Sequence, residues 1–126
     1  MRYIVVYYRW IEGGGAVSIR ADLIRGHTDA VILAQLMRRD SYGYEINKTL
    51  ESCSGGEFVL KEATLYTAFR RLEDSGLITS YWGDKPVGAR RKYYKITAQG
   101  REAYRQAREE WQNTVRILNA LLEEEA

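Results

Sequence analysis

Apolar residues recur at helical spacing in four stretches of the chain, and an alternating pattern lies between the third and the fourth. The third stretch runs from Glu62 to about Ser75 and is followed directly by Gly76, a residue type that commonly ends a helix. Its apolar residues follow the i, i+3, i+4, i+7 rule: Leu65, Ala68, Phe69 and Leu72. The pattern therefore predicts a helix with one buried face.

Two shorter helices are predicted before it. The first runs from Thr28 to Met37, with Thr28 or Asp29 as its N-cap. Its wide apolar face indicates that it is largely buried. The second covers residues 42–52, with Asp40 or Ser41 as its cap, and Gly55-Gly56 then breaks the chain.

The alternating stretch predicts a β-hairpin. Residues 77–82 form the first strand and residues 90–96 the second. Residues 83–89 between them hold two glycines, an aspartate and the only proline of the chain, which favours a turn. On the second strand Tyr94 and Ile96 share one face and are expected in the core.

A long final helix is predicted from the Thr97 cap to about Glu124. A helix of roughly 27 residues spans about 40 Å, more than a core built from residues 17–97 can cover. Part of its apolar stripe therefore needs a second chain. The residues expected at that dimer interface are Tyr104, Ala107, Trp111, Val115, Leu118, Leu121 and Leu122.

The first sixteen residues differ from the rest and end in three glycines. One interpretation is a short strand, residues 3–8, followed by a linker. The other is that native translation begins at Val17, with Glu12-Gly13-Gly14 reflecting a translated ribosome-binding sequence. The expected division is an N-terminal extension at 1–16, a winged helix-turn-helix domain at 17–97, and a dimerisation helix at 98–126.

Composition is that of one soluble globular domain, with 126 residues, 45% hydrophobic and 29% charged. The net charge of +2 is unevenly distributed. Residues 61–105 hold ten cations and five anions, whereas residues 106–126 hold two cations and five anions. A basic segment of this kind indicates a polyanionic partner.

Several classes of function are disfavoured. One cysteine, Cys53, and one histidine, His27, are too few for an ordinary zinc cluster, and no metal or cofactor is expected. The glycines at 13–15 lack the Lys-Ser/Thr of a phosphate loop, and no nucleophile–base pair is evident. The apolar run at 3–8 is too short to span a membrane. A cytoplasmic protein without enzymatic activity is expected.

The order helix, helix, helix, hairpin, long helix predicts a mainly α fold with a small β-hairpin, namely a winged helix-turn-helix plus a long C-terminal dimerisation helix. Three motifs, SYGYEI (41–46), ATLYTAFRRLEDSGLI (63–78) and GARRKYYKITAQG (88–100), resemble those of the PadR family of transcriptional regulators. The resemblance covers about residues 20–122. The single C-terminal helix resembles that of the family's short subfamily. The resemblance implies a homodimer, a recognition helix in the major groove, a wing on the phosphates, and repression relieved by a small molecule.

Two positions depart from the family pattern. Thr67 stands where many members have proline, and Phe69 where leucine is usual. Both residues fit a helix. The first sixteen residues match nothing expected of the family, which favours the Val17 start.

Ten residues are candidates for DNA contact because hydroxyl groups reach phosphates and arginine can donate two parallel hydrogen bonds to guanine. They are Tyr42, Tyr44, Thr64, Tyr66, Thr67, Arg70, Lys85, Arg90, Arg91 and Lys92. The alternatives are packing within the domain for the tyrosines, an ion pair with Glu73 or Asp74 for Arg70, and a solvated hairpin edge for the wing. Arg71 is expected in a structural ion pair.

Trp111 is the candidate effector-binding residue. A two-fold axis through the long helices would bring two indoles together and form a flat apolar slot for a planar aromatic ligand, similar to multidrug-binding family members. The alternative is that Trp111 belongs only to the interface core.

The predicted function is a homodimeric, DNA-binding repressor relieved by a small planar aromatic effector, acting on double-stranded DNA with two-fold-related half-sites about one helical turn apart. The alternative is a winged-helix module for protein contacts without DNA binding. The basic wing discriminates between them because a protein-binding version has less need of four cations there.

Overall fold

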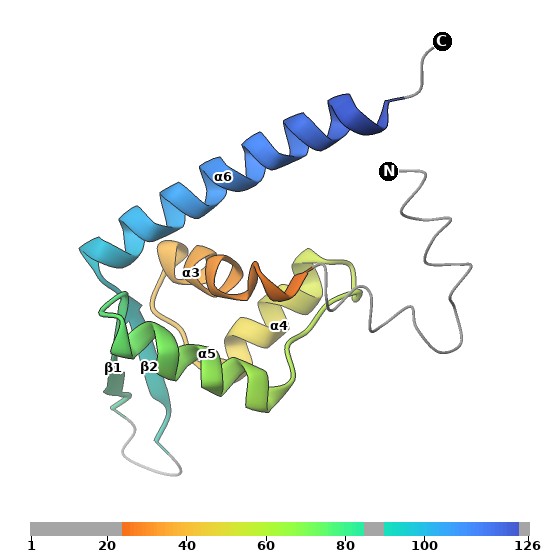
Figure 1. The fold of residues 1–126 in the computed structure, drawn as a ribbon. Coiled ribbons are helices and arrows are strands. Elements are labelled where there is room, and N and C mark those ends of the chain that lie inside the picture. The colour runs from red at the N-terminus through yellow and green to blue at the C-terminus, as the bar shows by residue number, and fades with distance from the viewer. Residues whose placement is uncertain (1–23, 85–89, 124–126) are drawn as a thin grey trace.

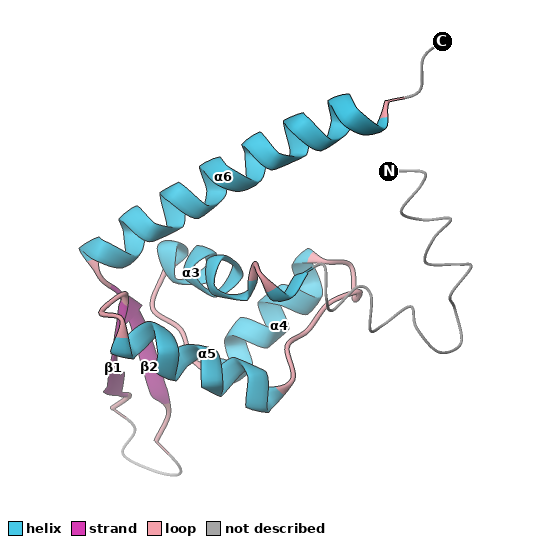
Figure 2. Cartoon of the chain, viewed as in Figure 1, coloured by secondary structure: helices cyan, strands magenta, loops and turns pink. Residues whose placement is uncertain are grey.

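The computed structural model describes residues 24–84 and 90–123. Along these residues the elements are α3 (Thr28–Arg38), α4 (Gly43–Cys53), α5 (Glu62–Asp74), β1 (Ile78–Trp82), β2 (Lys92–Ile96) and α6 (Ala98–Leu122). Figures 1 and 2 show α3, α4 and α5 gathered beside the hairpin, with α6 passing over α3 and continuing beyond it. The predicted mainly α fold with one hairpin and a long last helix is confirmed. The N-terminal extension and Val17 lie outside the described residues.

One apolar core joins the three short helices to the hairpin. Phe69 of α5 stacks on Tyr94 of β2, with ring centroids 3.8 Å apart, and both side chains are buried. Burying large side chains from separate elements supplies the main stabilisation of such a fold. The prediction that Tyr94 and Ile96 belong to the core is confirmed.

The hairpin is antiparallel, with a register from Ile78 opposite Ile96 to Trp82 opposite Lys92. Both strands are shorter than predicted, because β1 begins at Ile78 and β2 at Lys92. Arg90 and Arg91 therefore precede the second strand, although the Arg91 carbonyl still accepts a hydrogen bond from the amide of Gly83 at 2.6 Å.

The predicted caps of the first two helices were wrong. His27 is the N-cap of α3 and Tyr42 that of α4, and neither side chain caps its helix. Thr28 is instead buried, and Asp29 bonds to Arg71 of α5. A tertiary contact thus occupies the Asp29 side chain, which the local pattern assigned to capping. The end of α5 follows the prediction, with Gly76 in the left-handed region at φ 77°.

The start of α6 is fixed against the hairpin. The Thr97 hydroxyl accepts a hydrogen bond from the amide of Gly100 at 3.0 Å, so the predicted cap is confirmed. Thr97 also donates to the carbonyl oxygens of Gly76 and Leu77. Gly100 is buried against Leu77, where a Cβ atom would overlap the Leu77 carbonyl oxygen.

The apolar stripe of α6 has two parts. Its first turns pack on the molecule's own core, where Ala103 and Tyr104 lie against the buried cluster. Tyr104, predicted at the dimer interface, is thus half-buried within its own chain, and α6 packs on α3. Further along, Leu118, Leu121 and Leu122 are exposed.

Candidate nucleic-acid interface

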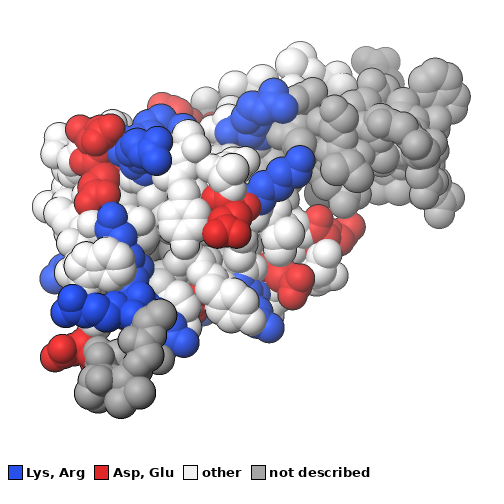
Figure 3. All heavy atoms as spheres, turned by 90° about the horizontal axis from the view of Figure 1, so that it is seen from below, with Lys and Arg blue, Asp and Glu red and all other residues white. Residues whose placement is uncertain are grey.

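Three elements contribute to one side of the molecule, namely the start of α4, the outer face of α5, and the hairpin, which is called the wing from here on. Thr64, Thr67 and Arg70 are exposed on α5, as the helical periodicity predicted. Figure 3 views the molecule from below and shows lysine and arginine side chains gathering at the wing end of this face. The described wing cations Arg90, Arg91 and Lys92 are all exposed, while Lys85 lies outside the described residues.

Tyr66 connects α5 to the start of α4. Its ring meets Phe69 edge to face at 5.6 Å, yet the side chain stays 43% exposed. Its hydroxyl lies over Gly43, where an added Cβ atom would come within 2.9 Å of that oxygen. Tyr66 therefore packs on its own domain and also presents a hydroxyl group beside the first turn of α4.

The two neighbouring arginines of α5 have different partners. Within the described part of the chain Arg70 makes no ion pair, and Glu73 instead accepts a hydrogen bond from the Ser80 hydroxyl at 2.6 Å. Arg71 forms the predicted structural pair, with Asp29 of α3 as its partner. That hydrogen-bonded carboxylate raises the pKa of Arg71 above its ordinary value.

An open hollow of about 580 Å³ separates the start of α3 from α5. Two DNA-contact candidates, Thr64 and Thr67, line it together with the Asp29–Arg71 pair. Because threonine hydroxyls and guanidinium N–H groups share this hollow, it offers hydrogen-bond donors next to the exposed face of α5.

At the start of α4, both candidate tyrosines lie at the surface. Tyr42 meets Tyr93 of the wing edge to face at 5.3 Å, and the Arg91 guanidinium lies over the Tyr42 ring at 4.7 Å. Such a cation–aromatic contact restricts the arginine while leaving its N–H groups available. Tyr44 is 67% exposed, with the Lys48 ammonium 5.7 Å from its ring centroid.

The wing carries a tyrosine stack that pattern reading did not identify. Tyr81 stacks on Tyr93 at 5.6 Å with an angle of 11° between the rings. The Tyr81 hydroxyl donates to the Asp40 carboxylate at 2.6 Å. This hydrogen bond raises the pKa of Tyr81 to about 12. Tyr81 lies on β1 and Tyr93 on β2, and the alternating sequence pattern could not show that Asp40 and Tyr42 meet them.

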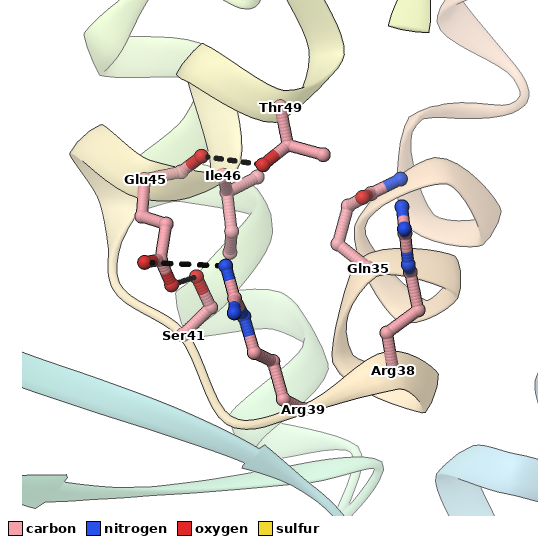
Figure 4. A pocket seen from close by; sticks show the side chains of 7 residues that line it. All are labelled: Gln35, Arg38, Arg39, Ser41, Glu45, Ile46 and Thr49. Carbon is pink, nitrogen blue, oxygen red and sulfur yellow. Dashed lines mark hydrogen bonds and ion pairs between the residues drawn. The ribbon is translucent and has the colours of Figure 1, made fainter.

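A second hollow, of about 310 Å³, lies between α3 and the start of α4 (Figure 4). There Glu45 accepts a hydrogen bond from the Ser41 hydroxyl at 2.6 Å and pairs with Arg39 at 3.5 Å. These contacts occupy the Glu45 carboxylate and fix the turn that leads into α4.

Trp111 lies where α6 passes the beginning of α3. Its ring meets His27 edge to face, with centroids 4.8 Å apart, and the side chain is 47% exposed. The candidate effector residue is thus in contact with the N-cap of α3. The sequence gives no signal for this contact because the two residues belong to different elements, far apart along the chain.

Two kinds of feature are absent from residues 24–84 and 90–123. No helix there has the length and apolar character needed to cross a membrane. The same ranges contain no group of three histidine, cysteine, aspartate or glutamate side chains placed to hold a metal ion.

The comparisons agree with this architecture. The model of the PadR-like transcriptional regulator family matches residues 32–106. An uncharacterized protein of Lysinibacillus sphaericus is 40% identical over 105 residues, which is 83% of this chain and 96% of that protein.

Solved structures give the same result. A transcriptional regulator from Clostridium thermocellum is 45% identical, with a TM-score of 0.76 over 82% of this chain and 97% of that one. A PadR family regulator from Eggerthella lenta is 32% identical, with a TM-score of 0.76 over 87% of this chain and 94% of that one. The family groups transcriptional regulators, which sets aside the enzyme alternative. This chain belongs to the PadR-like family of transcriptional regulators.

Proposed function

We propose that the protein is a homodimeric DNA-binding repressor whose operator binding is relieved by a small planar aromatic molecule. The observation that carries DNA binding is the joining of three donor-bearing elements into one surface. Ser41 and Tyr94 exchange backbone hydrogen bonds, and the Arg91–Tyr42 contact ties the wing to α4.

In this proposal α5 enters the major groove. The exposed Thr64, Thr67 and Arg70 supply donors for base edges and phosphates, and the Tyr66 hydroxyl lies beside them. Tyr42, Tyr44 and the wing cations Lys85, Arg90, Arg91 and Lys92 contact the phosphate backbone. Phosphate contacts fix orientation, whereas Arg70 is placed to read sequence.

A second copy of the chain is proposed to cover the distal part of α6. Four large apolar side chains there are exposed, namely Trp111 at 47%, Leu118 at 44%, Leu121 at 73% and Leu122 at 56%. An apolar surface of this extent is unusual on a helix that contacts only solvent. A two-fold partner would bury this stripe against itself and place two recognition helices on one duplex. Ile117, which the sequence interpretation omitted, is 42% exposed and widens the same surface.

The effector is proposed to bind between paired Trp111 rings. The exposed half of the indole leaves an aromatic surface that a flat ligand can cover. Such a ligand relieves repression only by binding one dimer geometry better than the other. Changing the spacing of the two α5 helices would then lower operator affinity.

The DNA part is tested by fluorescence anisotropy with DNA from just upstream of the gene, against a scrambled duplex, at several salt concentrations. We expect preference for the upstream DNA, and log affinity falling by about 0.9 for each neutralised phosphate against log salt. Arg91→Ala should reduce that slope by about one, whereas Arg108→Ala on α6 serves as the matched control. Equal, weak binding of folded protein to this DNA and to other candidate operators would favour the protein-contact alternative.

The effector part is tested with a planar cationic dye and tryptophan fluorescence. Quenching should disappear in Trp111→Ala and persist in Trp82→Ala, because Trp82 lies on the wing. Dye binding should also lower operator affinity. Unchanged dye binding by Trp111→Ala, or unchanged operator affinity with dye bound, would reject this part.

A further inference from the structure

We propose that Asp29 is a specificity-determining residue. It holds the Arg71 guanidinium in an orientation that favours hydrogen bonds to a base and disfavours contacts with phosphates of unrelated DNA. This inference rests on the proposed DNA binding and extends it to a residue pair outside the ten contact candidates. It turns the Asp29–Arg71 ion pair from a stabilising contact into part of the recognition surface.

The hydrogen-bond geometry leaves one edge of the guanidinium available. Asp29 accepts from Arg71 through both carboxylate oxygens, with the Nε to Oδ2 distance at 3.2 Å and the second bond from Nη2 to Oδ1. A guanidinium has five N–H donors, so this side-on pair leaves the two Nη1 donors and one Nη2 donor unused. The remaining Nη1–Nη2 edge is the one that can donate two parallel bonds to guanine O6 and N7.

The position of the pair supports contact with DNA. Arg71 and Asp29 line the same hollow as Thr64 and Thr67 on the exposed side of α5. Their side chains are 52% and 42% exposed, so neither is sealed from a ligand. A surface pair of this exposure adds little to stability, so using its arginine for recognition costs the fold little.

Asp29 is itself well anchored. It lies in the first turn of α3, where the helix dipole favours a carboxylate. Ile32 and Leu33, one turn further along, are buried in the core. A guanidinium held by a carboxylate on such an element loses few alternative orientations when it meets a base.

Removal of the Asp29 charge should change the affinity for the correct DNA sequence in the direction opposite to that expected from simple electrostatics. A carboxylate near DNA repels phosphates, so removing its charge should strengthen binding to every duplex. If Asp29 orients Arg71, removing that charge should weaken binding to the correct sequence. It should also release Arg71 for phosphates and so leave binding to unrelated DNA equal or stronger.

The experiment uses the full chain and a duplex selected by the wild-type protein from a randomised pool. Affinities for this duplex and for a scrambled one are measured for wild type, Asp29→Asn, Arg71→Ala and the double variant. Asp74→Asn, which removes an exposed carboxylate of α5, is the matched control for charge. Thermal unfolding confirms that each variant is folded.

We expect Asp29→Asn to lose at least about fivefold in affinity for the selected duplex, the lower end of what one bidentate contact discriminates, and Asp74→Asn to lose none. Arg71→Ala should lose as much and relax the preference at one guanine, and the double variant should match Arg71→Ala. Tighter binding of both duplexes by Asp29→Asn would overturn the proposal. A pool from which nothing is enriched would reject the proposed DNA binding itself, and this inference with it.

Discussion

Ser41 and Tyr94 exchange two backbone hydrogen bonds, from the Tyr94 amide to the Ser41 carbonyl at 2.7 Å and from the Ser41 amide to the Tyr94 carbonyl at 3.2 Å. This bridge pairs the turn before α4 with β2. Because backbone pairing does not depend on side-chain rotamers, the start of α4 and the wing are held in a fixed relation. The proposed DNA contacts on both can therefore meet one duplex together.

The contact between Arg91 and Tyr42 should matter for binding more than for stability. We predict that Tyr42→Leu lowers operator affinity by several-fold, because the Arg91 guanidinium loses the ring that restricts it. The midpoint of thermal unfolding should change little, since Tyr42 is half-buried rather than in the core.

A double-mutant cycle checks the cause. Tyr42→Leu and Arg91→Ala should together cost less than the sum of the single changes, because they disrupt one interaction. Tyr44→Leu combined with Arg91→Ala is the matched control for this coupling. Tyr44 is also a proposed DNA contact, but Arg91 does not cover its ring, so these two changes should be additive. Strict additivity in the cycle would show that the two residues act independently.

Tyr81 should lose its hydroxyl proton at a higher pH than an ordinary tyrosine. The Asp40 hydrogen bond raises its pKa to about 12, against an ordinary value of 10.0. A group whose folded pKa is raised contributes stability below its unfolded pKa and loses that contribution as pH rises through the folded pKa. The wing should accordingly lose this support between about pH 10 and pH 12.

Absorbance at tyrosinate wavelengths measures this directly. The difference between wild type and Tyr81→Phe should contain one group titrating near pH 12, and Asp40→Asn should shift that group toward its ordinary value. A Tyr81 signal that ignores Asp40→Asn would contradict the assigned cause.

Gly100 should not tolerate a side chain. A Cβ atom there overlaps the Leu77 carbonyl oxygen, which also accepts from the Thr97 amide. We predict that Gly100→Ala destabilises the fold by about 1–3 kcal/mol, the range for overpacking, despite the better helix propensity of alanine. Denaturant unfolding measures this loss, and Gln99→Ala in the same turn should be near neutral.

Much of the fold could be predicted because its signals are local. The α5 stripe, the Gly76 terminator and the Thr97 cap depend on neighbours within a turn or two, and the structure bears them out. The caps predicted at Asp29 and Asp40 failed for the opposite reason. Asp29 is engaged by Arg71, forty-two residues away, and no local pattern reports such a partner.

The candidate site likewise has one part that the sequence predicts and another that it does not. Helical periodicity correctly placed Thr64, Thr67 and Arg70 on the exposed side of α5. Contacts between elements stayed out of reach, as the Tyr81–Asp40 hydrogen bond and the His27–Trp111 contact show. Tyr104 shows what an apolar stripe cannot predict. Periodicity identifies the apolar face of α6, but not whether the chain's own core or a second chain covers each residue on that face.

The distal stripe of α6 should control assembly. We predict that Leu118→Glu combined with Leu121→Glu converts the proposed dimer to monomer, because burying two carboxylates in an apolar interface is strongly unfavourable. Sedimentation velocity measures the molecular mass. Asn113→Glu, on the opposite side of α6, should leave the dimer intact, and an unchanged mass in the Leu118/Leu121 variant would exclude this stripe as the interface.

Trp111 should report the same association by its accessibility. Its emission is isolated as the difference between wild type and Trp111→Phe. We predict that acrylamide quenches this emission less as protein concentration rises, because a partner chain covers an indole that is 47% exposed in one chain. Quenching of Trp82, measured the same way, should not depend on concentration if the wing stays outside the interface.

Because the apolar stripe of α6 extends beyond α3, the proposed dimer links the cellular concentration of the protein to its lifetime. In the proposed dimer, part of the apolar surface that holds the chain in its folded state is buried only when a second copy arrives. By mass action, the melting temperature then rises with the number of copies in the cell. Chains made at a low rate would spend more time as monomers and meet proteases more often, so synthesis rate and lifetime would reinforce each other.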